Sequence, residues 1–183
     1  MLRAATRSFL ARGYRSSVDE IARRAGVAKQ TVYHHFPSKD LLFKAVARDL
    51  ATRVLIELEA EPADLRAGLL RFAAAYRARA LGAQGIATFR TLVPEVARFP
   101  ALARAMYAAS AGVLVERLAG YLGRAMDAGR LRRDDPQFAA EMLLSMLAGQ
   151  DRIKRLFNVA GSSPQEKARR TARIVECFLR AYQ

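Results

Sequence analysis

The sequence of 183 residues has few cysteines, histidines, glycines and prolines. Cys177 is the single cysteine, so no disulfide can form within the chain, and we expect a reducing, cytoplasmic environment. The glycines and prolines stand singly among abundant alanine, leucine and arginine, a composition typical of an all-helical protein. No run approaches the roughly 18 apolar residues of a membrane span. The first residues, MLRAATRSF, lack the apolar core and cleavage site of a signal peptide.

The two histidines, His34 and His35, do not form a metal-binding pattern. On a helix their side chains point about 100° apart, whereas two metal ligands on one helix face need a spacing of four residues and a third partner. No third histidine exists, and no GxSxG turn presents a nucleophilic serine. We therefore expect neither a cofactor nor enzymatic activity.

Positive charge dominates the chain, with a formal net charge of +14. Residues 1–50 hold ten Lys or Arg and four Asp or Glu, so the charge is densest there. A basic surface favours nucleic acid or another anionic partner. The alternative is an arginine-rich coding bias on ordinary solvated helix faces, which the ratio of 26 arginines to five lysines also fits.

Helix start and stop signals divide the chain into about nine helices. Ser17-Val18-Asp19-Glu20 and Ser163-Pro164-Gln165-Glu166 are capping boxes. Other predicted starts are Glu61-Pro62, Phe99-Pro100 and Asp135-Pro136, and predicted stops are Gly13, Gly26, Gly82, Gly129 and Gly161. The expected helices are 2–12, 17–24, 28–35, 38–60, 63–81, 84–97, 100–128, 135–158 and 163–182.

The first three helices are short and the others are long. This contrast predicts a small N-terminal module, residues 1–46, joined through the helix that begins at Ser38 to a larger helical bundle, residues 47–183. No flexible linker separates the two, so movement in the bundle can be transmitted rigidly to the module.

The N-terminal module has the pattern of a helix-turn-helix. A short apolar-striped helix is followed by a tight turn at Gly26, where a positive φ is expected, and by a second short helix. Val32 and Phe36 are expected to point into the core. The remaining polar side chains of residues 28–35 then lie on the open side of this helix.

The residues that carry a family resemblance are 9–46, FLARGYRSSVDEIARRAGVAKQTVYHHFPSKDLLFKAV. They resemble the DNA-binding domain of the TetR family of transcriptional regulators, with Ala28 where such proteins often carry a serine that caps the recognition helix. The resemblance begins at the first helix, without the basic arm that many members carry. Residues 88–149, TFRTLVPEVARFPALARAMYAASAGVLVERLAGYLGRAMDAGRLRRDDPQFAAEMLLSMLAG, resemble the C-terminal ligand-binding and dimerisation domain of the AefR-like branch.

The resemblance implies two kinds of DNA contact. The contacts that determine sequence specificity would be made with base edges in the major groove. There a Lys side chain suits guanine, a Gln side chain suits adenine, and a Thr methyl can contact a thymine methyl. The expected base-reading residues are Lys29, Gln30, Thr31 and His34. The expected phosphate-binding residues are Ser16, Ser17, Tyr33, His35, Ser38 and Lys39. The alternative for this face is an ordinary solvated surface.

The second module has no catalytic motif. Aromatic, flexible or singly polar residues on its apolar faces are candidates for a ligand pocket, although ordinary core packing is the alternative for each. These candidates are Phe72, Tyr76, Phe89, Met106, Tyr107, Ser110, Met146 and Gln150.

The last two helices carry apolar and small residues at helical spacing. Such faces either dimerise or pack within one chain. The expected dimer-interface residues are Phe138, Met142, Ser145, Gly149, Ala168, Thr171, Val175, Phe178, Leu179 and Tyr182.

We expect a homodimer that reads two half-sites of a palindromic operator, about 34 Å apart. As a repressor it would be released by a small, mostly apolar ligand. The alternatives are a ligand-independent DNA-binding protein or an activator of the same fold, a non-specific basic protein, and an enzyme.

Overall fold

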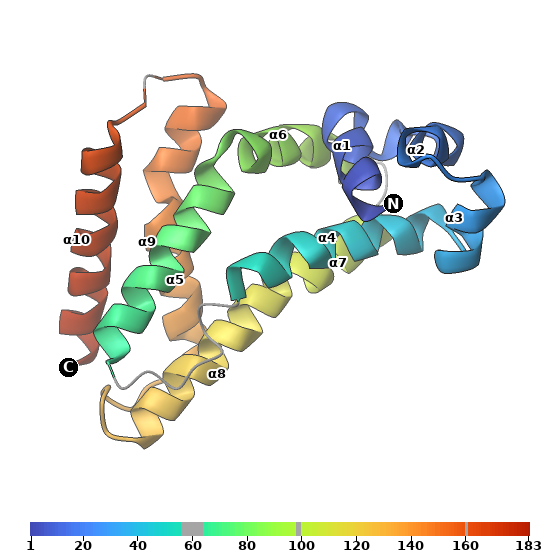
Figure 1. The fold of residues 1–183 in the computed structure, drawn as a ribbon. Helices are drawn as coiled ribbons and strands as arrows, with labels where there is room; N and C mark the ends of the chain where they lie inside the picture. Colours follow the sequence, from blue (N-terminus) through green and yellow to red (C-terminus); the bar gives the residue numbers. More distant parts are fainter. Residues whose placement is uncertain (56–63, 98–99, 160) are drawn as a thin grey trace. The chain divides into compact units, whose positions relative to one another are not determined.

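The computed structural model describes residues 1–55, 64–97, 100–159 and 161–183, and every regular element in those ranges is helical (Figure 1). None of these helices combines the length and apolar character needed to cross a membrane. The α-helices are α1 (Leu2–Arg12), α2 (Val18–Ala25), α3 (Lys29–His35), α4 (Lys39–Leu55), α5 (Leu65–Leu81), α6 (Ala83–Leu92), α7 (Pro100–Tyr107), α8 (Val113–Asp127), α9 (Pro136–Leu156) and α10 (Pro164–Tyr182). The same ranges hold 3₁₀ segments, η1 (Gly13–Arg15) and η3 (Val93–Glu95), and a π-helical segment, η4 (Ala108–Gly112).

The all-helical class predicted from the sequence is confirmed. The predicted helix 100–128 is an uninterrupted helical run of α7, η4 and α8. The predicted helix 84–97 is shorter, because α6 gives way to η3, where Pro94 has no amide hydrogen to continue α-helical bonding. The predicted start at Glu61-Pro62 and the predicted helix end at residue 60 lie outside the described residues.

Predicted side-chain caps begin the last two helices. Ser163 Oγ accepts a hydrogen bond from the Glu166 amide at 3.2 Å, and the Glu166 carboxylate accepts one from the Ser163 amide at 2.7 Å. Asp135 Oδ1 accepts from the Gln137 amide at 2.8 Å. Each cap is followed by a proline at the first helical position, where no amide donor is lost.

The chain forms two compact units. The first unit comprises residues 1–52 and 87–112, and the second unit comprises residues 53–86 and 113–183. The division of the chain into residues 1–46 and 47–183 stays a prediction.

The core of the first unit is built from the first four helices. Ile21, Val32 and Leu42, from α2, α3 and α4, are each at most 1% exposed. Phe9 and Phe43 pack edge to face with ring centroids 4.6 Å apart, a favourable aromatic geometry. These contacts hold the three short helices in a fixed arrangement.

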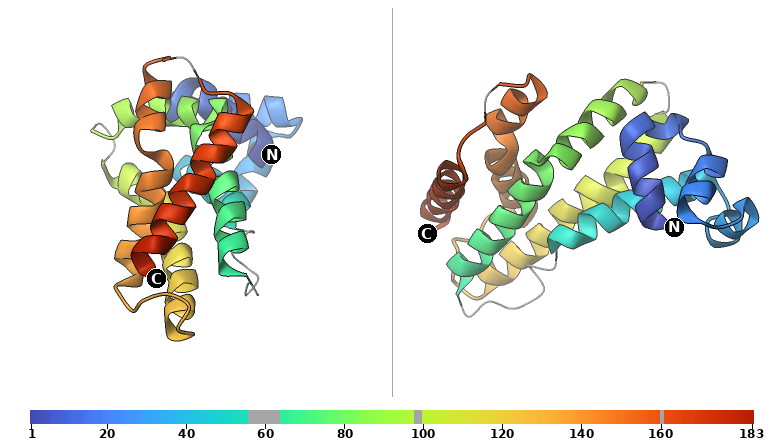
Figure 2. Two further views of the ribbon diagram at one scale, coloured as in Figure 1. Left: turned by 90° about the vertical axis from the view of Figure 1, so that its left-hand side faces the viewer. Right: turned by 45° about the horizontal axis from the view of Figure 1, so that its top comes forward.

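The second unit is a bundle in which α5 packs against α9 and α10, and α8 packs against α9 (Figures 1 and 2). Its core is continuous across these four helices. Fully buried side chains from each helix form its centre, and these are Leu69, Phe72, Leu118, Leu122, Leu143, Leu147, Val175 and Phe178.

One buried ion pair stabilises a kink in α9. Gly149 has φ +27° and ψ −134°, which interrupts the helix. Arg77 donates to the Leu147 carbonyl at 2.5 Å and to the Asp151 carboxylate at 2.6 Å, so it joins α5 to both sides of the kink. Arg170 of α10 donates to the same Asp151 oxygen at 2.9 Å. Burial disfavours the charged carboxylate, but the Arg77 hydrogen bond and the Arg170 charge outweigh burial and lower the pKa of Asp151.

We predict that Asp151→Ala lowers the free energy of unfolding by about 3–5 kcal/mol, because it leaves a buried guanidinium without its carboxylate. The Arg77 side chain is only 7% exposed. The matched control is Asp134→Ala, which removes an exposed pair with Arg132 and should cost at most about 1 kcal/mol. Urea unfolding followed by circular dichroism measures both effects.

The loss of unfolding free energy in Asp151→Ala should become smaller as the pH falls. Because the pKa of Asp151 is lower in the folded chain, its stabilisation is fully present above the unfolded value of about 3.9 and is lost as the pH falls through the folded value. The difference between wild type and Asp151→Ala should therefore shrink in acid. An equal difference at pH 7 and in strong acid would contradict this account.

Candidate nucleic-acid interface

A single apolar anchor fixes the orientation of α3. Val32 is 1% exposed and sits in the core, and Phe36, which follows the helix, packs against that core. The other six residues of α3 are exposed, and these are Lys29, Gln30, Thr31, Tyr33, His34 and His35. The structure therefore places all the base-reading candidates on one short exposed helix.

The turn between α2 and α3 has the expected glycine. Gly26 has φ +67° and ψ +31°, in the left-handed region, and its amide donates to carbonyls at the end of α2. The Val27 amide donates to the Ala22 carbonyl at 3.1 Å, which closes the turn. Ala28 precedes α3 and has no side-chain acceptor to cap it.

Lys29 forms an ion pair in the free protein. Its ammonium lies 3.0 Å from each carboxylate oxygen of Asp19 on α2. The hydrogen bond to Asp19, aided by the carboxylate charge, raises the pKa of Lys29. To reach a base edge, Lys29 must leave this carboxylate, so Asp19 restrains a residue that the sequence predicts to read DNA.

The predicted phosphate-binding serines differ in their availability. Ser16 is 1% exposed and its hydroxyl donates to the Ser8 carbonyl at 2.7 Å, so its expected phosphate contact does not fit this structure. The hydroxyl oxygens of Ser17 and Ser38 accept the amides of Glu20 and Leu41, each at 3.2 Å. Each of these two caps a helix and keeps its hydroxyl proton for an external acceptor.

Lys39 lies beside a tyrosine that sequence reasoning missed. Its ammonium is 4.3 Å from the centroid of the Tyr14 ring, a cation–π distance. The Tyr14 hydroxyl donates to Asp40, and burial together with this hydrogen bond raises the pKa of Tyr14 to about 12. Partial burial lowers the pKa of Lys39, although Asp40 opposes this effect. The ring thus positions a predicted phosphate-binding cation at the start of α4.

The eight ligand-pocket candidates are divided equally between the two units. Phe72 and Tyr76 stack in the core of the second unit with centroids 6.0 Å apart. Met146 is half-buried and Gln150 is exposed in that unit. The other four belong to the first unit, where Met106 packs against the core, Ser110 donates to the Met106 carbonyl, and Phe89 and Tyr107 are exposed.

The dimer-interface candidates divide between the core and the surface. Five of them are at most 6% exposed within the single chain, and these are Thr171, Val175, Phe178, Leu179 and Tyr182. Their expected contact with a second copy does not fit, because this face of α10 packs inside one chain. Phe138, Ser145, Gly149 and Ala168 are exposed, and Met142 is half-buried.

Two family matches cover most of the chain. Residues 1–46 match the bacterial regulatory proteins of the tetR family. Residues 67–183, more than half of the chain, match the C-terminal domain of AefR-like transcriptional repressors. A comparison with curated proteins finds no match.

Solved structures of transcriptional regulators resemble the chain over nearly its full length. A TetR-family regulator from Mesorhizobium loti is 29% identical, with 99% of this chain and 94% of that chain covered and a TM-score of 0.81. The flavonoid-responsive regulator FrrA is 30% identical, with 100% and 94% covered and a TM-score of 0.79. A TetR family regulator from Pseudomonas syringae is 28% identical, with 99% and 94% covered and a TM-score of 0.72.

We predict that Asp19→Asn tightens DNA binding about two- to fivefold, because it frees Lys29 from an exposed ion pair, and such pairs are weak. Fluorescence anisotropy with a bound duplex measures the change. In a Lys29→Ala background the same substitution should have less effect. An equal gain in both backgrounds would show that Asp19 acts through overall charge and not by restraining Lys29.

Proposed function

Because the chain belongs to the TetR family of bacterial regulatory proteins and carries an AefR-like repressor C-terminal domain, we propose that it is a cytoplasmic homodimeric repressor. It binds a palindromic operator and is released by a small, mostly apolar ligand. The observation that carries the proposal is the exposed polar surface of α3, held in place by buried Val32.

The proposed contacts with DNA come from exposed and half-buried residues of the first unit. Lys29, Gln30, Thr31 and His34 read base edges in the major groove. Backbone phosphates are bound around them, and the residues that do this are Ser17, Tyr33, His35, Ser38 and Lys39. Phosphate contacts set the register of the helix and base contacts set the sequence.

The proposed dimer uses exposed apolar side chains of α9 and of Phe157, which follows it. Phe138, Ile153 and Phe157 are 57%, 48% and 77% exposed, an unusual exposure for large apolar side chains. Ser145 lies between them on α9, and its small side chain allows close approach of a second helix. A two-fold dimer is also needed to read two half-sites, since one short helix contacts only a few base pairs.

The proposed ligand is mostly apolar. FrrA, which matches the whole chain at 30% identity, is described as flavonoid-responsive, and flavonoids are flat aromatic molecules with a few hydroxyl groups. The ligand acts by preferring a conformation that does not fit the operator, and such preferences are typically worth about 1–3 kcal/mol.

Selection of bound sequences from random duplex DNA tests the operator proposal. The salt concentration should be about 150 mM, because phosphate-driven affinity falls with salt. We expect an enriched palindrome with half-sites about 34 Å apart. Gln30→Ala, selected in parallel, should relax the preference at one base position in each half-site by about fivefold or more. Binding without enrichment would overturn the sequence-specific function.

We predict that Ile153→Glu raises the dimer dissociation constant at least about tenfold, because it places an unpaired charge in the proposed interface. Sedimentation velocity over a range of protein concentrations measures this constant. The matched control is Val96→Glu, since Val96 in the first unit is also 48% exposed. Equal effects of both substitutions, or none, would contradict an interface on α9.

A further inference from the structure

The second unit contains a cavity that the sequence did not reveal. Its volume is about 420 Å³, within the range of roughly 300–1,000 Å³ that is typical of small-molecule sites. It lies between the C-terminal ends of α5 and α9, the linker that follows α9, and the first turns of α10. None of the eight ligand-pocket candidates from the sequence lines it.

Positive charge dominates the cavity wall. Arg77, Lys154, Arg155 and Lys167 line it together with one carboxylate, Asp151. That carboxylate is already held by two guanidinium groups, those of Arg77 at 2.6 Å and Arg170 at 2.9 Å. A negatively charged ligand therefore meets excess positive charge here.

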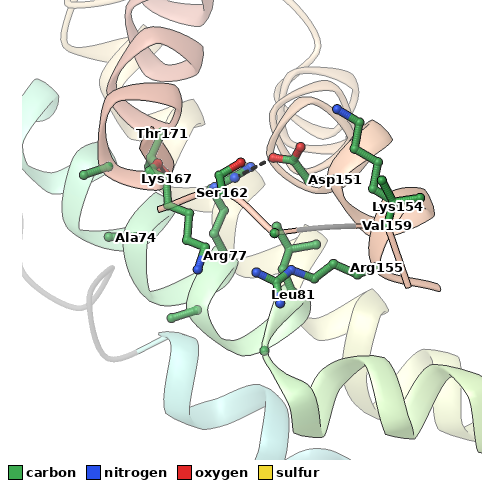
Figure 3. A pocket seen from close by; sticks show the side chains of 14 residues that line it. Ala74, Arg77, Leu81, Asp151, Lys154, Arg155, Val159, Ser162, Lys167 and Thr171 are labelled. Carbon is green, nitrogen blue, oxygen red and sulfur yellow. Dashed lines mark hydrogen bonds and ion pairs between the residues drawn. The ribbon is translucent and has the colours of Figure 1, made fainter. Parts of the chain in front are cut away.

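Two of the cations are directed into this space. Figure 3 shows the Arg155 side chain extending from α9 and the Lys167 side chain extending from α10 toward the same region beside α5, whereas Lys154 points away. The Arg155 guanidinium also lies near the linker, since a Cβ atom on Gly161 would be 3.7 Å from it.

Apart from Arg77, which is bound to Asp151, the α5 wall is apolar. Ala74, Ala78 and Leu81, on one side of α5, form this wall, and Val159 from the linker adds to it. A ligand that fits both walls has an apolar body and an anionic group at one end.

We propose that this cavity binds a small organic carboxylate, with its carboxylate between Arg155 and Lys167 and its apolar body against α5. A guanidinium matches a carboxylate with two parallel hydrogen bonds, and charge-assisted bonds of this kind are about twice as strong as neutral ones. The assignment depends on the second unit alone and does not require operator binding.

The test is isothermal titration calorimetry on the full chain with 2-naphthoate and its uncharged isostere 2-naphthamide. We expect the carboxylate to bind at least about tenfold more tightly than the amide, as the loss of charge-assisted hydrogen bonds implies. Inorganic phosphate, an anion without an apolar body, should bind more weakly than 2-naphthoate. The titration contains no DNA, so its failure leaves the operator proposal unaffected.

Substitutions locate the site. Lys167→Gln and Arg155→Gln should each weaken 2-naphthoate binding about tenfold, whereas Lys167→Arg should retain it. Arg169→Gln is the matched control, because Arg169 is on the same helix and does not line the cavity. Circular dichroism checks that each variant folds.

Four results would overturn the proposal. The first is no binding of 2-naphthoate up to about 10 mM, a range well above useful small-ligand affinity. The second is equal affinity for 2-naphthamide, and the third is phosphate binding as tight as that of 2-naphthoate. The fourth is an equal loss of affinity in Lys167→Gln and Arg169→Gln.

Discussion

The orientation of α3, whose exposed face we propose binds DNA, depends on the burial of one valine. α3 has seven residues, and Val32 is the one among them that enters the core, against Ile21 and Leu42 from the helices on either side. A helix this short is not stable alone in water, so packing and not propensity determines its position. With Val32 buried, the period of the helix directs the polar side chains outward. The orientation of all the exposed α3 side chains therefore depends on one small hydrophobic contact.

Carboxylates then set how the cations on this unit are presented. Asp19 holds Lys29, Glu20 pairs with both Arg12 and Arg24, and Asp40 accepts the hydroxyl of the tyrosine whose ring lies beneath Lys39. Several positively charged side chains of the first unit are therefore bound to specific carboxylates. Lys29, Arg12 and Arg24 are held at defined positions by neighbouring carboxylates of the same unit.

Local signals in the sequence predicted most of the helices, because caps, prolines and glycines act over a few residues. The exposed face of α3 was also predictable, since it follows from helical period and a single turn. Contacts between residues that are distant in the sequence were not predictable in this way. Ser16 was predicted to bind a phosphate, but its hydroxyl donates a hydrogen bond to the Ser8 carbonyl inside the unit. The apolar stripe of α10 looked like a dimer face, yet it packs within one chain, because period alone cannot tell which surface covers a stripe. The cationic cavity is lined by residues from three helices that are far apart in the sequence, so no local spacing could predict it.

The π-helical segment η4 lies within the continuous helical run from α7 to α8, at the point where the first unit ends and the second begins. A π turn contains one residue more than an α turn, so it advances the phase of all later side chains by about 100° around the helix axis. A helix can accommodate one additional residue as such a π turn. Removing one residue here would leave a continuous α-helix, but every residue after position 112 would then be turned about the helix axis. A change of one residue in length at this point would therefore alter the facing of an entire helix and not the length of a loop.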